Sequence, residues 1–153
     1  MLTTATGILV IALGLICWVG QTLVVFAPNV AVKLGVFERE QELDRSMYLF
    51  ERFSQGVPDI LLTWILPAAA LMMILGVEQW PLFALVGGGV YLYFPAVFII
   101  TRIALKKDGK KIGRPSSVFA AYSLGALWMI SAAYMIFLAV EELSGVASAL
   151  KTG

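Results

Sequence analysis

Four long apolar stretches, separated by polar connections, dominate the pattern of hydrophobic and polar positions along the chain. They cover residues 7–27, 60–77, 81–101 and 118–140. About 20 apolar residues in a helix rise roughly 30 Å, which matches the hydrocarbon core of a bilayer. The pattern therefore predicts four transmembrane helices. A cleaved signal peptide is the alternative for the first stretch, but no basic residue precedes it and no clear small-x-small site follows it.

Two polar connections, residues 28–59 and 102–117, join the first span to the second and the third to the fourth. Within the first connection, residues 41–57 alternate with the period of an amphipathic helix. Its apolar face carries Leu43, Met47, Phe50, Phe53 and Val57. We expect this helix to lie along the membrane surface, with Glu51, Arg52 and Gln55 in water. The prediction is a single all-α membrane domain over residues 1–153, a four-helix transmembrane bundle with an amphipathic cytoplasmic connecting helix.

Lysine and arginine fall almost entirely in these two connections. Of the 11 basic residues only Lys151 lies outside the connections and their edges. Four crossings place both connections on one side, and the positive-inside rule makes that side cytoplasmic. The charge pattern thus supports an even number of spans and non-cytoplasmic N- and C-termini. An integral protein of the bacterial inner membrane is favoured.

Composition narrows the possible functions. Sixty per cent of the residues are hydrophobic, 14% are charged, and the net charge of +1 gives no field that would attract nucleic acid. Because the chain has no histidine and one cysteine, Cys17, it lacks the ligands of common metal and haem sites. We expect no metal, no cofactor and no nucleic-acid partner, and we interpret Cys17 as a packing residue.

Polar side chains concentrate toward the cytoplasmic half of the spans. We hypothesise an inward-opening polar pocket, with the candidate ligand-binding residues Arg52, Asp59, Thr63, Tyr93, Arg102 and Tyr122. The alternative is an ion pair with hydrogen bonds that fixes how the helices pack. Because the predicted second span begins at residue 60, no ionisable group is expected at mid-depth. This disfavours a proton-coupled carrier built around a central carboxylate.

The second connection is basic and contains glycine and proline, which predicts a flexible loop. Its cations are candidates for binding lipid headgroups, although orientation alone also requires them: Lys106, Lys107, Lys110, Lys111 and Arg114. Small residues in the last two spans permit close helix packing, either within the bundle or between subunits of a homo-oligomer or larger complex: Gly87, Gly88, Gly89 and Gly125.

No catalytic constellation stands out. We therefore favour a non-catalytic helper subunit, or a binder of membrane lipid or another hydrophobic small molecule. The alternative is a membrane enzyme acting on an amphipathic substrate at the cytoplasmic interface. Glu51, Arg52, Gln55 and Pro58 resemble part of the Arg/Asn/Glu/Pro pattern that enters the second span of the membrane-associated glutathione and eicosanoid transferases. The asparagine of that pattern and its following glutamate are missing here, and the third span lacks the family's arginine and tyrosine spacing.

Overall fold

The computed structural model describes the backbone of residues 2–152 and the side chains of residues 3–145. It is an all-α bundle, and no β-strand occurs in the described chain. Four helices are long and apolar enough to cross a membrane: Thr3–Phe26, Arg45–Ile74, Trp80–Lys107 and Pro115–Gly145. The predicted four-helix bundle is confirmed, and the chain is an integral membrane protein.

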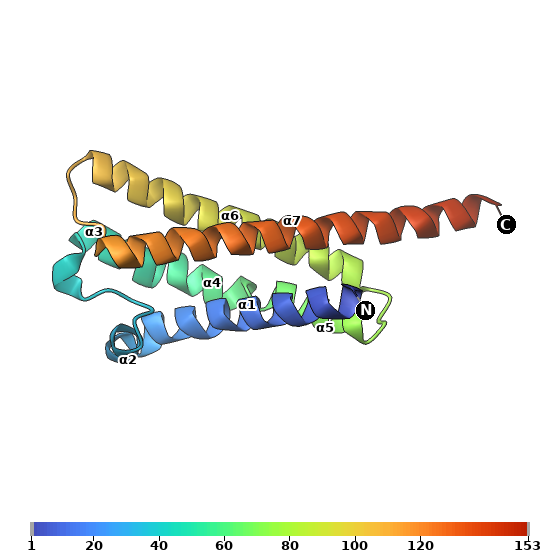
Figure 1. Ribbon diagram of the computed structural model, residues 1–153, viewed down its shortest axis with the longest axis horizontal. Coiled ribbons are helices and arrows are strands. Elements are labelled where there is room, and N and C mark those ends of the chain that lie inside the picture. Colours follow the sequence, from blue (N-terminus) through green and yellow to red (C-terminus); the bar gives the residue numbers. More distant parts are fainter. Residues whose placement is uncertain (1, 153) are drawn as a thin grey trace.

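The helices run up and down in sequence order (Figure 1). Helix α1 (Leu2–Phe26) is followed by the short α2 (Pro28–Lys33) and a single turn, η1 (Glu40–Glu42). The second span is a succession of segments, α3 (Arg45–Leu49), η2 (Phe50–Gln55), α4 (Gly56–Leu62) and α5 (Ile65–Ile74). Helices α6 (Trp80–Lys107) and α7 (Pro115–Thr152) complete the bundle. Both long connections lie at one end, which we call the loop end, as the sequence predicted (Figure 1).

The second span starts much earlier than hydropathy indicates. Asp44 caps it, because its carboxylate accepts a hydrogen bond from the Ser46 N–H at 2.9 Å. The helical span then reaches Ile74, with one break between Leu62 and Ile65, so the separate surface helix predicted over residues 41–57 is wrong. Thirty residues in a helix rise about 45 Å, which is longer than the hydrocarbon core is thick. Either the first turns of this helix extend beyond the hydrocarbon core or the helix is tilted in the membrane.

The polar face of the predicted amphipathic helix is placed differently from the prediction. Phe53 and Val57, expected to face the membrane, are 45% and 41% exposed on the outside of the bundle. Glu51 and Gln55, expected in water, are buried. Apolar side chains are about as stable in lipid as in a protein core, whereas polar side chains in lipid lack hydrogen-bond partners. The arrangement of lowest free energy therefore turns the polar face of this helix into the bundle.

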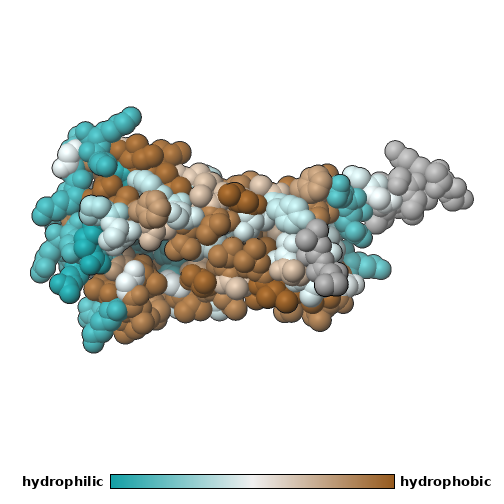
Figure 2. All heavy atoms as spheres, viewed as in Figure 1, coloured by the Kyte–Doolittle hydropathy of each residue, from teal (hydrophilic) through white to brown (hydrophobic). Residues whose placement is uncertain are grey.

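The surface has the banding of a membrane protein. Apolar residues cover the middle of the molecule, and hydrophilic residues gather at its two ends, most densely at the loop end (Figure 2). Two buried apolar clusters hold the helices together. One includes Val10, Leu66 and Met135, and the other, at the loop end, includes Phe37 and Met47.

Candidate functional site

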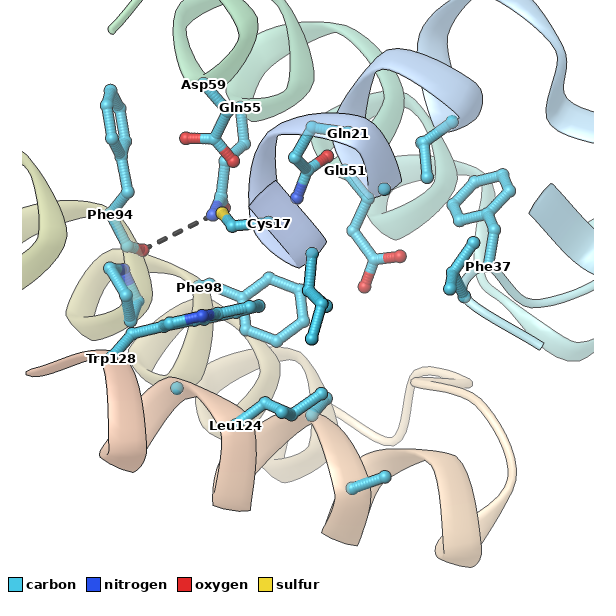
Figure 3. Close-up of a pocket in the computed structure, with 18 of the residues that line it drawn as sticks. Cys17, Gln21, Phe37, Glu51, Gln55, Asp59, Phe94, Phe98, Leu124 and Trp128 are labelled. Atoms are coloured by element: carbon cyan, nitrogen blue, oxygen red, sulfur yellow. Dashed lines mark hydrogen bonds between the residues drawn. The ribbon is translucent and has the colours of Figure 1, made fainter. Parts of the chain in front are cut away.

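A cavity of about 200 Å³ lies among the four spans, toward the loop end. Glu51, Gln55 and Asp59 reach it from the second span, Cys17 and Gln21 from α1, Phe94 and Phe98 from α6, and Leu124 and Trp128 from α7 (Figure 3). Glu38 and its neighbours in the first connection line the loop end of the same space. The cavity is therefore apolar around much of its wall, and several of its polar side chains come from the second span, joined by Gln21, Glu38 and Arg102 from other elements.

The polar groups of the second span form a row, one every four residues: Glu51, Gln55, Asp59 and Thr63. In a regular α-helix each step of four residues drifts by about 40°, so four such residues would not share one face. The widened turn η2 reduces this drift, because a π-helical turn takes more residues than an α-helical one. All four side chains are consequently buried.

Arg102 of α6 opposes the loop-end member of this row. Its Nε donates to Glu51 Oε1 at 2.9 Å, and its Nη2 contacts the same oxygen more closely. The guanidinium also lies over the Phe98 ring, 4.5 Å from its centroid. Both charges are buried, so Glu51 and Arg102 form a buried ion pair that joins α6 to the second span.

Three buried polar atoms in the cavity have no hydrogen-bond partner among the described residues: Gln55 Oε1, Asp59 Oδ1 and Arg102 Nη1. Gln55 Nε2 donates a hydrogen bond to the Phe94 carbonyl at 3.3 Å. This bond fixes the orientation of the Gln55 amide, so Gln55 Oε1 points away from Phe94. Unpaired buried polar groups are rare in folded proteins because each costs roughly 1–3 kcal/mol. Three in one cavity indicate a space built for something polar.

The next turn of the second span is shaped by Pro67. Proline has no N–H to donate to the carbonyl four residues earlier, which belongs to Thr63, and the helix breaks between α4 and α5. The Tyr91 hydroxyl of α6 donates to this freed carbonyl at 2.8 Å. A tyrosine thereby satisfies the backbone at the far end of the cavity, which is how proline is tolerated within a membrane span.

Helices α1 and α7 are in contact at few positions. Helix α7 packs along α6, whereas it touches α1 only sparsely. The contact includes a hydrogen bond from Trp128 Nε1 to the Leu13 carbonyl at 3.0 Å. On the loop side of this contact, small residues line the cavity: Gly20 of α1 and Ala120 and Ala121 of α7.

Half of the predicted pocket residues meet in this cavity. Asp59, Thr63 and Arg102 line it, but Arg102 pairs with Glu51 and not with Asp59. Arg52 does not line it, and donates instead to the Tyr48 hydroxyl at 2.9 Å and the Val25 carbonyl at 3.5 Å.

The two predicted tyrosines are placed differently. Tyr93 is 63% exposed on the outer surface, and Tyr122 is half-buried without lining the cavity. Sequence reasoning missed Glu51 and Gln55, which it assigned to a solvated face. Their four-residue spacing from Asp59 was the available signal.

The position of Asp59 along its helix also differs from the prediction. It lies halfway along the helix Arg45–Ile74, beside the same cavity as Cys17 of α1 and Tyr91 of α6. The expectation that no ionisable group lies at mid-depth was derived from a second span that begins at residue 60, and the helix begins at Arg45 instead. Cys17 lines the cavity as well as packing between helices.

The basic connection is packed against the first connection and is joined to it by hydrogen bonds and ion pairs. The Asp44 N–H donates to the Lys111 carbonyl at 2.8 Å, and the Gly113 N–H donates to the Glu42 carbonyl at 3.1 Å. Arg114 lies 3.1 Å from Glu38 and 3.4 Å from Glu42, and Lys110 lies 4.0 Å from Asp44. Lys106, Lys107 and Lys111 are exposed, and headgroup binding by this loop stays a prediction.

Glu38 joins the two connections, because it accepts hydrogen bonds from both the backbone and the side chain of Arg114. Burial raises its pKa, but hydrogen bonds with Ser117, Glu42 and the Arg114 backbone, together with the Arg114 charge, outweigh burial and lower the pKa below its ordinary value. A lowered carboxylate pKa stabilises the folded state at neutral pH, and that stabilisation is lost only as pH falls through the folded pKa. The two connections are thus held together over the physiological pH range.

Three of the four predicted packing glycines are used inside the bundle. A Cβ at Gly87 would lie 2.6 Å from the Leu66 backbone nitrogen, and one at Gly88 would lie 2.5 Å from the Ile136 side chain. Gly125 packs near Ile99, whereas nothing lies within 4 Å of a Cβ at Gly89. The glycines thus serve helix packing within one chain, and a subunit interface stays a prediction.

We compared the chain with family models, curated proteins and solved structures. None of them matches it. Within the described residues, no group of three or more histidine, cysteine, aspartate or glutamate side chains is placed to hold a metal ion. The cavity is therefore the candidate functional site of the described residues.

Proposed function

We propose that the protein is a non-catalytic binder of a small amphipathic molecule, which it holds in the cavity among its spans. One observation carries the proposal: Gln55, Asp59 and Arg102 all line the same cavity, and each has a buried polar atom without a hydrogen-bond partner. A molecule with a polar end would satisfy these atoms, while its apolar body would contact Phe94, Leu124 and the other apolar residues of the wall.

The size of the cavity fits a compact ligand. An engineered protein cavity of about 150 Å³ binds benzene, and the cavity here is larger, at about 200 Å³. A ring or short chain with one polar substituent would fill it. A whole phospholipid would fit only with its chains outside, in the sparsely packed gap between α1 and α7.

The same gap supports entry from the bilayer. Small side chains at Gly20 and Ala121 leave room beside the cavity, and the ionic contacts of Glu38 with Arg114 cover its loop end. Among the candidate polar residues that a membrane enzyme would have to bring together, Asp59 and Arg102 line the cavity, while Arg52 and Tyr93 do not. The geometry thus favours binding over catalysis.

Blocking the cavity tests this function. We expect Ala121→Trp to fill the space and weaken binding about tenfold or more, which corresponds to 1.4 kcal/mol or more. The probes are 1-naphthylmethanol and 1-naphthylmethylammonium, titrated by calorimetry into protein in lipid nanodiscs and corrected with empty nanodiscs. Ala126→Trp, on an exposed face of the same helix, is the matched control. The proposal fails if neither probe binds the wild type, or if both tryptophan variants bind alike.

We further propose a bacterial inner-membrane location with the loop end in the cytoplasm. Four helices, with both connections at one end, support this orientation once the basic residues are considered. In a Cys17→Ser background, single cysteines at Ser116 and Ser144 should react with an impermeant maleimide from opposite sides: the first only after the cells are opened, the second in intact spheroplasts. Labelling of both from the same side would contradict the orientation.

A further inference from the structure

We propose that the ligand is an organic ammonium ion, a compact hydrophobic body that carries a primary amine, with Asp59 as its counter-ion. This inference rests on the proposed function and specifies the chemical class of the ligand. It follows from the charge balance of the cavity, from the two unpaired acceptors, Gln55 Oε1 and Asp59 Oδ1, and from the aromatic rings that line the cavity. The third unpaired atom, Arg102 Nη1, is a donor that an ammonium ion does not satisfy.

The cavity contains one carboxylate more than its cations neutralise. Glu51 pairs with Arg102, and Glu38 pairs with Arg114, so both of these carboxylates have a counter-charge. Asp59 has no ion pair among the described side chains, although it is only 2% exposed. A buried charge without a partner is very costly in a medium of low dielectric constant. Asp59 therefore requires a cation from outside the protein or a proton.

The two unpaired acceptors favour a ligand with several donors. Gln55 Oε1 and Asp59 Oδ1 lie one turn apart on the same buried row, and neither has a donor. A protonated Asp59 has one O–H, which would donate to Gln55 Oε1 and leave the carboxyl group neutral. A primary ammonium has three N–H donors, so it can serve both acceptors while Asp59 stays charged.

Aromatic rings in the cavity wall also favour a cation. Phe94 and Trp128 line the cavity wall from α6 and α7 (Figure 3). The faces of such rings attract cations, and the attraction is worth about 2 kcal/mol when the cation is desolvated. The positive charge of Arg102 does not cancel that of Asp59, because Glu51 already neutralises it. Carboxylate, amide oxygen and rings together match an ammonium group with an apolar body.

The matched probes separate this inference from the general function. 1-Naphthylmethylammonium and 1-naphthylmethanol share one ring system and differ in the polar group. We expect the wild type to bind the ammonium about tenfold or more tightly than the alcohol, as expected for a hydrogen bond to a charged group. Asp59→Asn should abolish that preference. Glu78→Gln, an exposed carboxylate in the turn before α6, should retain it.

Each result has a distinct meaning. Equal binding of the two probes, with both blocked by Ala121→Trp, would overturn the ammonium inference and leave the proposed function intact. Failure of both probes to bind would overturn both. A preference for ammonium that persists in Asp59→Asn would exclude Asp59 as the counter-ion. A melting temperature of Asp59→Asn near that of the wild type shows that the variant is folded, and the alcohol titration serves as a second check on its cavity.

Discussion

Arg102→Met is expected to destabilise the bundle by about 3–5 kcal/mol, because it leaves Glu51 buried without a counter-charge. The Arg102 and Glu51 side chains are 4% and 9% exposed, so water cannot take the place of the lost partner. Methionine preserves most of the volume beside Phe98, which isolates the loss of charge from a loss of packing. The measurement is reversible unfolding in mixed micelles at increasing denaturing detergent, followed by tryptophan fluorescence.

The companion variants test whether the ion pair is responsible. Glu51→Leu combined with Arg102→Met removes both charges, and replacement of a whole buried pair by apolar residues is often neutral. We expect the double variant to recover most of the lost stability. Arg114→Met should cost less than about 1 kcal/mol, because its side chain is 57% exposed and surface pairs contribute little. Equal stability of the Arg102→Met variant and the wild type would show that the buried pair does not stabilise the protein.

Gly87→Ala is expected to cost about 1–3 kcal/mol, the usual range for overpacking a core. The added Cβ would lie 2.6 Å from the Leu66 nitrogen and 2.8 Å from its Cα. These are backbone atoms of α5, so no side-chain rotation relieves the contact and the two helices must move apart. Unfolding in the same detergent series measures the loss.

Gly89→Ala is the matched control, two residues further along the same helix. Nothing lies within 4 Å of the added Cβ, and alanine favours the helix over glycine. Its stability should equal or slightly exceed that of the wild type. If the two variants were equally stable, α5 and α6 would not approach each other as closely as the structure shows.

The arrangement of the spans was predictable because lipid imposes it. A span must be long and apolar, and basic residues mark the connections that are not translocated, so hydropathy and charge gave the number of helices and the shared side of both connections. The start of the second span was not predictable in the same way. Glu51, Gln55 and Asp59 lower its hydropathy, yet they are buried inside the bundle, where they contact protein instead of lipid.

Helix rotation explains what was found and missed in the cavity. Asp59 and Arg102 were identified from their positions near the ends of apolar stretches. Tyr93 was chosen where Tyr91, two residues away, is the buried one. Sequence alone does not give the angle at which a membrane helix faces its neighbours, because both sides of the helix are apolar. The row from Glu51 to Thr63 becomes visible only when its four-residue spacing is taken as an inward face.

The widened turn at Phe50–Gln55 makes the winding of the backbone, as much as residue identity, a constraint on this protein. A π-helical turn takes up one residue more than an α-helical one. If the same six residues wound as a regular α-helix, everything before the turn would rotate by roughly the angle of one residue, about 100°, relative to everything after it. Glu51 would then leave Arg102 while Asp59 stayed in place.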